Sequence, residues 1–213
     1  MKKYNKLAMF GGTFSPFHNG HIAALKAYVE TVSPDVVYII PTAIPPHKCR
    51  SDSATDEQRL KMIQMSVENL KIGCEIVVSD LEIARGGKSY TIDTVEQLKK
   101  IANSVVIYCG TDMVLTLDKW YNFKRLLSII SVAYMQREND LRFDSAVKDT
   151  VERLHIMYGT EFIALPPVSD EISSSMIRKM IQEKEDITGL VDENVAKFIY
   201  DQELYMKGEL SEQ

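Results

Sequence analysis

The chain has 213 residues, of which 45% are hydrophobic and 26% are charged. This length suits one domain, and the apolar content is enough for a full core, so we expect a soluble, globular protein rather than a disordered one. The formal net charge of -5 argues against a nucleic-acid partner, because broad binding to nucleic acid needs a basic face that neutralises phosphates.

Targeting and redox signals point to the cytoplasm. No apolar run approaches the roughly 20 residues that span a bilayer, and the apolar stretch after the basic start is too short for a signal peptide. Cys49, Cys74 and Cys109 are odd in number and widely separated, which favours reduced thiols over a disulfide framework. We therefore expect a cytoplasmic protein with no membrane partner, while a homo-oligomer stays open.

Short apolar runs alternate along the chain with segments of helical periodicity. The predicted strands are residues 7–10, 36–40, 75–78, 105–109, 131–135 and 162–165. Apolar residues spaced three and four apart predict helices over 21–31, with Ile22, Leu25 and Val29 on one face, and over 55–70, with Leu60, Ile63 and Val67. Thr55 and Gln58 form a capping-box signature at the start of the second helix.

This alternation predicts an α/β fold, with a Rossmann-like, doubly wound, mostly parallel sheet covered by helices on both faces. After Arg178 the chain is predicted to continue as helix, with Val191, Val195, Phe198 and Ile199 at helical spacing. We expect one domain over 1–213, with a C-terminal helical part at about 172–206. In such sheets ligands bind at the carboxyl ends of the strands, so the loops that follow the strands are the candidate sites.

The first of these loops, GGTFSPFHNGH at 11–21, joins a predicted strand to a predicted helix. Glycines at 11 and 12 would let a ligand approach the main chain, and amides at the helix start could bind a phosphate. The spacing differs from that of the dinucleotide motif G-x-G-x-x-G. A zinc site built from His18, His21, His47 and Cys49 is an alternative, although the last two follow two prolines and no H-E-x-x-H is present.

Other loops carry further candidates for an anion site. Lys48 follows two prolines on the loop after the second strand, and Asp112 follows the fourth strand, where a carboxylate could accept hydrogen bonds from ribose hydroxyls. The segment ISSSMIR at 172–178 places hydroxyls at a helix start and Arg178 one turn on, although its serines could simply be N-caps. The G-K-S at 87–89 is not a P-loop, because Glu82 stands where that motif needs glycine.

Seven motifs in order give the chain a resemblance along nearly its whole length. They are GGTFxPxHxGH at 11–21, PPHK at 45–48, SYTxxT at 89–94, GxD at 110–112, KW at 119–120, ISSSMIR at 172–178 and VxxxVxxxI from Val191. The sequence thereby resembles the nucleotidyltransferases marked by H-x-G-H, and within them the family of bacterial nicotinate-nucleotide adenylyltransferases. Ser15 stands where that family usually has aspartate, and Ser175 stands where threonine is usual.

The resemblance implies transfer of AMP from ATP to nicotinate mononucleotide, which gives deamido-NAD and pyrophosphate in NAD biosynthesis. Such a transfer needs two positioned anions and stabilised charge, and it needs no nucleophilic side chain. Alternative acceptors are nicotinamide mononucleotide and, ranked lower, phosphopantetheine. An alternative of another class is a nucleotide-binding regulator without turnover. Mg²⁺ is expected to arrive with ATP, with no metal site on the protein itself.

The resemblance also assigns residues by position. The catalytic set it implies is His18, His21, Lys48 and Arg178. The ATP-binding set it implies is Gly11, Gly12, Thr13, Phe14, His18, His21, Gly110, Asp112, Ile172, Ser174, Ser175 and Arg178. The set it implies for nicotinate mononucleotide is Lys48, Tyr90, Thr91, Trp120 and Tyr121, with the single tryptophan stacking on the pyridine ring.

Overall fold

The computed structural model describes residues 2–44, 54–135, 141–168 and 172–206. Six strands in this part of the chain form one sheet in the order β3-β2-β1-β4-β5-β6, and every neighbouring pair is parallel. The strands are β1 (Tyr4–Gly12), β2 (Val36–Pro41), β3 (Glu75–Val78), β4 (Ala102–Cys109), β5 (Ser131–Met135) and β6 (Glu161–Leu165). The predicted fold class is thus confirmed, and each predicted strand lies within an observed one.

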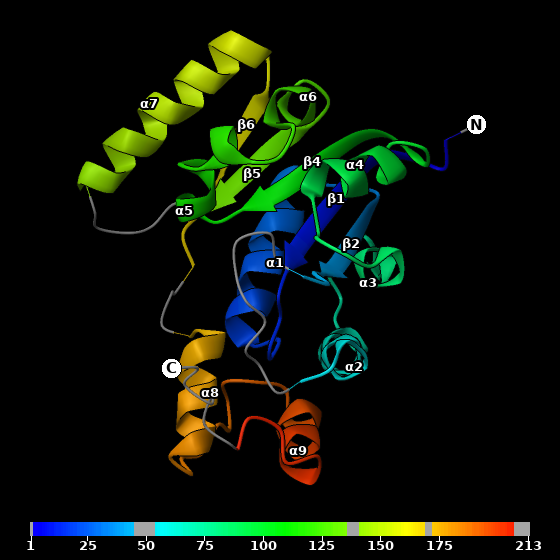
Figure 1. Ribbon diagram of the computed structural model, residues 1–213, viewed down its shortest axis with the longest axis vertical. Coiled ribbons are helices and arrows are strands. Elements are labelled where there is room, and N and C mark those ends of the chain that lie inside the picture. The colour runs from blue at the N-terminus through cyan, green and yellow to red at the C-terminus, as the bar shows by residue number, and fades with distance from the viewer. Residues whose placement is uncertain (1, 45–53, 136–140, 169–171, 207–213) are drawn as a thin grey trace.

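Helices cover both faces of the sheet (Figure 1). They are α1 (Asn19–Val32), α2 (Asp56–Val67), α3 (Leu81–Arg85), α4 (Thr91–Leu98), α5 (Thr111–Val114), the 3₁₀ turn η1 (Leu117–Lys119), α6 (Phe123–Leu127), α7 (Leu141–Tyr158), α8 (Ser174–Gln182) and α9 (Glu193–Asp201). Alternate residues of β1 separate the two layers of core. Leu7 and Met9 pack with residues of α4, α6 and α7, whereas Ala8 and Phe10 pack with residues of α1 and α2.

The C-terminal part corrects one prediction. Instead of continuing as one helix after Arg178, the chain forms α8 and α9, and residues 183–192 between them are not helical. Positive φ angles at Lys184 and Gly189 end the helical path, and Asp192 caps α9 by accepting from the N–H of Asn194. Val191, predicted to lie in a helix, therefore precedes α9.

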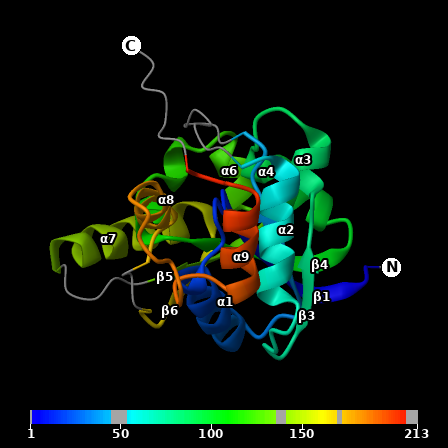
Figure 2. The same cartoon turned by 90° about the horizontal axis from the view of Figure 1, so that it is seen from below.

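A third apolar cluster joins this C-terminal part to the rest of the fold. It packs Met62 of α2 against Ile177 and Ile181 of α8 and against Val195 and Ile199 of α9. Figure 2 shows α9 alongside α2. The single-domain boundaries stay a prediction.

The order of strands reverses between β1 and β4. In parallel sheets this is where a crevice opens at the carboxyl ends of the strands. The loop after β1 and the loop after β4 therefore begin at the same edge of the sheet, on either side of the switch. In Figure 1, β1 and β2 point toward the end of the molecule where α2, α8 and α9 lie. Among the described residues, no helix is both long and apolar enough to cross a membrane.

Candidate active site

The helix α1 begins with two histidines that cap each other. The backbone N–H of His21 donates to Nδ1 of His18 at 3.4 Å, and the backbone N–H of His18 donates to Nδ1 of His21 at 3.2 Å. This is a capping box in which imidazoles take the places usually held by a hydroxyl and a carboxylate or amide. The ring centroids lie 3.6 Å apart. The bond pattern fixes the tautomers: because each Nδ1 accepts, each neutral ring carries its proton on Nε2.

Burial keeps both rings uncharged at neutral pH. It lowers the pKa of His18 from 6.5 to about 4, and the side chain is 6% exposed. Burial also lowers the pKa of His21 well below its ordinary value, and a positive charge on His18 would lower it further. The site therefore offers two fixed, neutral Nε2–H donors at the start of a helix of 14 residues.

Aromatic packing holds the loop that leads to these histidines. The ring of Phe17 stacks on His21 with centroids 5.0 Å apart, and Phe14 meets the same imidazole edge-on at 5.1 Å. Phe14 has a φ of +53 and is buried. A Cβ added to Gly12 would lie 2.6 Å from its ring. The sequence predicted that Gly12 leaves room for a ligand, but in this structure the ring of Phe14 fills that space.

The serine-arginine segment meets this loop across more than 150 residues of sequence. The hydroxyl of Ser174 donates to the carbonyl of Pro16 at 2.9 Å, and Nη1 of Arg178 donates to the carbonyl of Ser15 at 2.8 Å. The carbonyl of Ile172 lies 3.3 Å from the position of a Cβ on Gly20, so glycine permits this approach. The structure thus brings two of the predicted phosphate-binding segments together.

The three serines of the segment differ in what they can still donate. Ser173 is the N-cap of α8 and accepts from the N–H of Met176. The hydroxyl of Ser174 is engaged with Pro16, so its predicted bond to a phosphate requires that contact to exchange. Ser175 accepts from Nη2 of Arg178 at 3.4 Å and keeps its own proton available.

Ser15, which departs from the pattern of the family, has a structural partner. Its side chain is 1% exposed, and its Oγ lies 2.9 Å from the hydroxyl of Tyr205, which is equally buried. The peptide bond from Ser15 to Pro16 is cis. The hydroxyl at position 15 therefore connects the loop after β1 to the last described turn of the chain, a contact that no motif in the sequence indicates.

Four of the five residues predicted to bind the mononucleotide, all but Lys48, lie at the start of α4 and after η1. The rings of Tyr90 and Tyr121 lie 4.4 Å apart, and Tyr121 is 59% exposed. Thr91 is the first residue of α4, and Trp120 is half-buried beside the core. The buried hydroxyl of Ser89 accepts from the N–H of Ala43, which ties this segment to the loop after β2.

Of the remaining predicted residues, those after β4 lie within the described part of the chain, and those on the loop after β2 lie outside it. Gly110 is the N-cap of α5, and Asp112 is exposed in its first turn. Lys48 lies outside the described residues, as do His47 and Cys49 of the zinc alternative. Among the residues that are described, no group of three His, Cys, Asp or Glu side chains could hold a metal ion.

One buried cation near the site was not among the predicted residues. Arg59 of α2 is 1% exposed, and it donates to the carbonyls of Thr13 and Thr42 on the loops after β1 and β2. A signal was present in the sequence, since Arg59 precedes Met62 and Ile63 by three and four residues and so shares their buried face. The predicted face had placed Leu60 there instead, whereas Leu60 is only half-buried.

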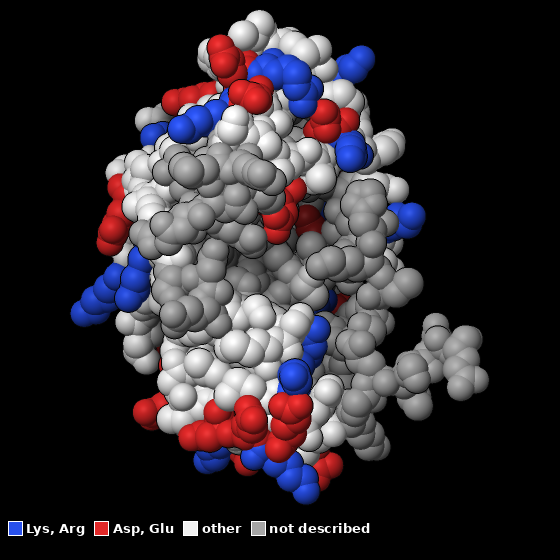
Figure 3. Space-filling model, turned by 90° about the vertical axis from the view of Figure 1, so that its left-hand side faces the viewer, with Lys and Arg blue, Asp and Glu red and all other residues white. Residues whose placement is uncertain are grey.

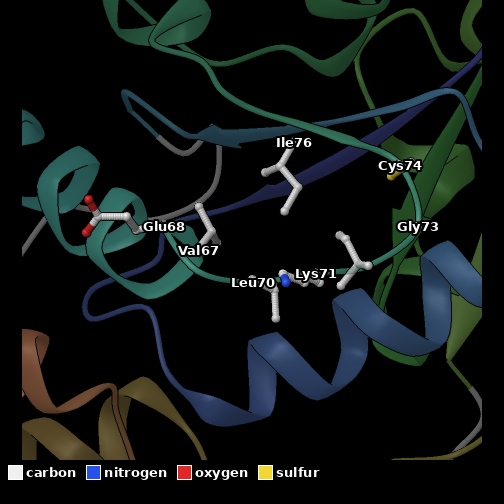
Figure 4. Close-up of a pocket in the computed structure, with 8 residues that line it drawn as sticks. Val67, Glu68, Leu70, Lys71, Gly73, Cys74 and Ile76 are labelled. Carbon is white, nitrogen blue, oxygen red and sulfur yellow. The ribbon is translucent and has the colours of Figure 1, made fainter.

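A hollow elsewhere on the surface is separate from these residues. It lies at the amino end of β3, between the end of α2 and the strand, and is lined by Val67, Gly73, Cys74 and Ile76 (Figure 4). The carboxyl ends of the strands are at the opposite edge of the sheet. On the face shown in Figure 3, described acidic and basic side chains lie beside one another at both ends rather than in one area of a single sign.

The sequence is similar to known proteins along almost its whole length. Residues 9–180 match the cytidylyltransferase-like family. A Staphylococcus epidermidis protein named "Probable nicotinate-nucleotide adenylyltransferase" is 31% identical over 202 residues, covering 94% of this chain and 97% of its own length. A protein of the same name from Halalkalibacterium halodurans is 33% identical over 206 residues, covering 96% and 93%. The chain belongs to the nicotinate-nucleotide adenylyltransferase family. The resemblance inferred from the motifs is confirmed.

Solved structures with low sequence identity share the fold of this nicotinate-nucleotide adenylyltransferase family member. The Plasmodium falciparum nicotinic acid mononucleotide adenylyltransferase in complex with NaAD superposes with a TM-score of 0.75 at 17% identity, covering 94% of this chain and 97% of that one. The same protein in complex with APC gives a TM-score of 0.72 at 19% identity, with the same coverage. At these identities the likeness shows the fold alone.

Proposed function

We propose that this chain transfers the AMP unit of ATP to nicotinate mononucleotide, giving deamido-NAD and pyrophosphate. Membership of the family supports this, since relatives that carry its name match almost the whole chain. The observation that carries the proposal is the pair His18 and His21. Two neutral rings present fixed Nε2–H donors at a helix start, beside the strand switch where nucleotides bind in such sheets.

The reaction requires charge stabilisation rather than a protein nucleophile. An oxygen of the 5′-phosphate of nicotinate mononucleotide attacks the α-phosphorus of ATP. The bond from that phosphorus to the bridging oxygen breaks, and pyrophosphate leaves with the electron pair. The protein has to hold two anions in line and to donate hydrogen bonds to the charge that builds up on the transferring group and on pyrophosphate.

The described side chains suit these tasks. His18 and His21 would donate from Nε2 to the α- and β-phosphates, and neutral imidazoles can do so while Nδ1 still accepts the capping bonds. Arg178 has five N–H donors, and its hydrogen bonds to the Ser15 carbonyl and to Ser175 leave capacity for the polyphosphate, as does the hydroxyl proton of Ser175. We assign Lys48 to the same anions from the resemblance alone, because it lies outside the described residues.

The other assignments remain proposals of the same kind. Gly110 and Asp112 would hold the ribose of ATP, and Thr91, Trp120 and Tyr121 would hold the nicotinate ring. The proximity of the rings of Tyr90 and Tyr121 supports an aromatic pocket there. Mg²⁺ would enter as part of the ATP complex, since it binds largely through phosphate oxygens and water. We propose a cytoplasmic location from the sequence alone, since the buried thiol of Cys109, whose pKa burial raises to about 12, is unreactive in any compartment.

The test is pyrophosphate release by the purified chain. The protein is incubated with Mg-ATP and, separately, with nicotinate mononucleotide, nicotinamide mononucleotide and phosphopantetheine. We expect release with the nicotinate acceptor to exceed that with the other two. A preference for the amide would overturn the acceptor, and no release with any of the three would overturn the enzyme assignment.

Two variants of His21 separate its capping from its phosphate role. His21→Ala removes both, whereas His21→Gln keeps an acceptor at the N3 position of the capping box and so preserves the helix start. We expect His21→Ala to lower kcat by roughly a hundred- to a thousandfold, as for loss of an oxyanion donor, and His21→Gln, which keeps an amide N–H, to lower it less. Both variants lose the ring that Phe14 and Phe17 contact, but only His21→Ala also loses the cap, so it should lose more thermal stability. If the folded fraction of His21→Ala kept the kcat of the wild type, His21 would have no role beyond the cap.

A further inference from the structure

The side chain of Arg59 connects the loop after β1 to the loop after β2. It rises from α2, and its Nη1 donates to the carbonyl of Thr13 at 2.6 Å. Its Nη2 donates to the carbonyl of Thr42 at 2.6 Å and also contacts the carboxylate of Asp56. Thr13 directly follows β1 and Thr42 directly follows β2. One guanidinium thus holds the main chain just beyond the ends of two neighbouring strands.

Such a cation is not needed to fill the core. A buried charge costs free energy unless it is paired and hydrogen-bonded, and an apolar side chain of similar volume often serves as well. The one described carboxylate on Arg59 is that of Asp56, whose side chain is 29% exposed and therefore partly solvated. The other partners are backbone carbonyls, which any sequence would supply. The contacts therefore stabilise a particular path of the two loops.

The position of the loop after β1 determines where the ring of His21 lies. Thr13 is followed by Phe14, and Phe14 packs against both Phe17 and His21. The N–H of Thr42 also donates to the carbonyl of Gly12 at 2.9 Å, so the two loops are bonded to each other as well as to Arg59. Because packed aromatic rings shift together rather than separately, a displacement at Thr13 would displace the imidazole of His21.

We propose that Arg59 is a positioning residue for adenylyl transfer: it sets the loop after β1 so that the histidine pair meets the polyphosphate in the reactive geometry. The inference rests on the proposed function and adds a residue to it. Arg59 need not touch substrate. A misplacement of about 1 Å in a reacting group can cost roughly a hundredfold in rate, which sets the size of effect expected from its loss.

The contacts of Arg59 depend on the planar guanidinium group and not on its charge alone. Two terminal nitrogens donate at once to two carbonyls and a carboxylate. The ammonium of lysine has all its donors on one nitrogen, so Arg59→Lys keeps the charge but cannot place one donor nitrogen against each loop as the guanidinium does. Arg59→Met removes the charge and keeps most of the volume. Leu154→Ala is the matched control, because Leu154 is fully buried on α7, in the part of the core away from these loops.

The experiment measures kcat, the KM of each substrate and the melting temperature for the wild type and the three variants. We expect Arg59→Lys and Arg59→Met to lose about a hundredfold in kcat, with KM changed only a few-fold. Leu154→Ala should lower the melting temperature while its folded fraction keeps the kcat of the wild type. If Arg59→Lys keeps kcat within twofold of the wild type, or if Leu154→Ala loses kcat to the same extent, the inference is overturned.

Chemical rescue gives a second measurement that does not depend on the stability of one variant. Guanidinium at millimolar concentration is added to Arg59→Ala, with urea as the neutral molecule of the same shape. An increase of kcat by at least tenfold with guanidinium, and not with urea, would support the role of the guanidinium group of Arg59. Equal effects of the two additives would contradict it. Absence of pyrophosphate release by the wild type would overturn the proposed function and this inference together, whereas an active wild type with an unaffected Arg59→Lys would overturn the inference alone.

Discussion

The hydrogen bond between Ser15 and Tyr205 gives a prediction about how the C-terminal part is held. The two hydroxyls lie 2.9 Å apart, and both side chains are 1% exposed. Tyr205→Phe removes one of them and leaves the hydroxyl of Ser15 buried without this partner. Ser15→Ala does the converse. Either change should lower the free energy of unfolding by about 1–3 kcal/mol, the usual cost of leaving a buried polar group unpaired.

The double variant isolates this pair from whatever else Tyr205 contacts. In a cycle of wild type, Ser15→Ala, Tyr205→Phe and the double variant, contributions that do not involve both hydroxyls cancel. We expect a coupling of about 1 kcal/mol or more, with the double variant less destabilised than the sum of the single ones. Urea unfolding followed by the fluorescence of the single tryptophan measures all four proteins. A coupling below about 0.3 kcal/mol, the scatter of independent sites, would refute the assignment of this bond.

Two further predictions concern the histidines and the tryptophan. The pKa of His18 is about 4 in the folded chain and 6.5 in the unfolded one, so the unfolded chain binds more protons between these pH values. The contribution of His18 to the free energy of unfolding is therefore complete above pH 6.5 and falls by about 3 kcal/mol as the pH drops to 4. Urea midpoints at pH 7.5 and pH 5 should differ less in His18→Asn, which keeps an N-cap, and an unchanged difference would contradict the assignment. Nicotinate mononucleotide should quench Trp120 fluorescence on binding, whereas a signal unaffected at saturating ligand would place the pyridine ring elsewhere.

Local patterns predicted the framework well because they act through neighbours in the sequence. The capping box of Thr55 and Gln58 forms as expected, with both of its hydrogen bonds present. The strands follow from short apolar runs, and the order of motifs located the loops at the strand switch. The break between α8 and α9 begins at a positive φ of Lys184, a residue with no strong preference for that conformation, whereas Gly189 and the N-cap Asp192 were signals in the sequence that the helical spacing of the apolar residues outweighed.

Contacts between distant residues account for the rest. Arg59 and Arg178 both donate to backbone carbonyls, which every residue possesses, so no sequence motif marks the partner. The partner of Ser15 lies 190 residues away in the chain. The filling of the space above Gly12 by Phe14 likewise depends on the rotamer of a ring. The sequence shows which side chains can donate hydrogen bonds, but only the folded chain shows which groups accept them.

In the proposed function, the two histidines would combine helix capping with phosphate binding in one motif. Nδ1 of each ring accepts from the helix start, and this leaves the proton on Nε2, which would be the donor to a phosphate. The burial that makes the rings sensitive to acid also prevents them from charging at neutral pH, so each keeps the same donor through the reaction. A serine or aspartate would cap the helix equally well but would offer no second nitrogen. An imidazole can cap the helix with one ring atom and, in the proposed function, would bind the substrate with the other.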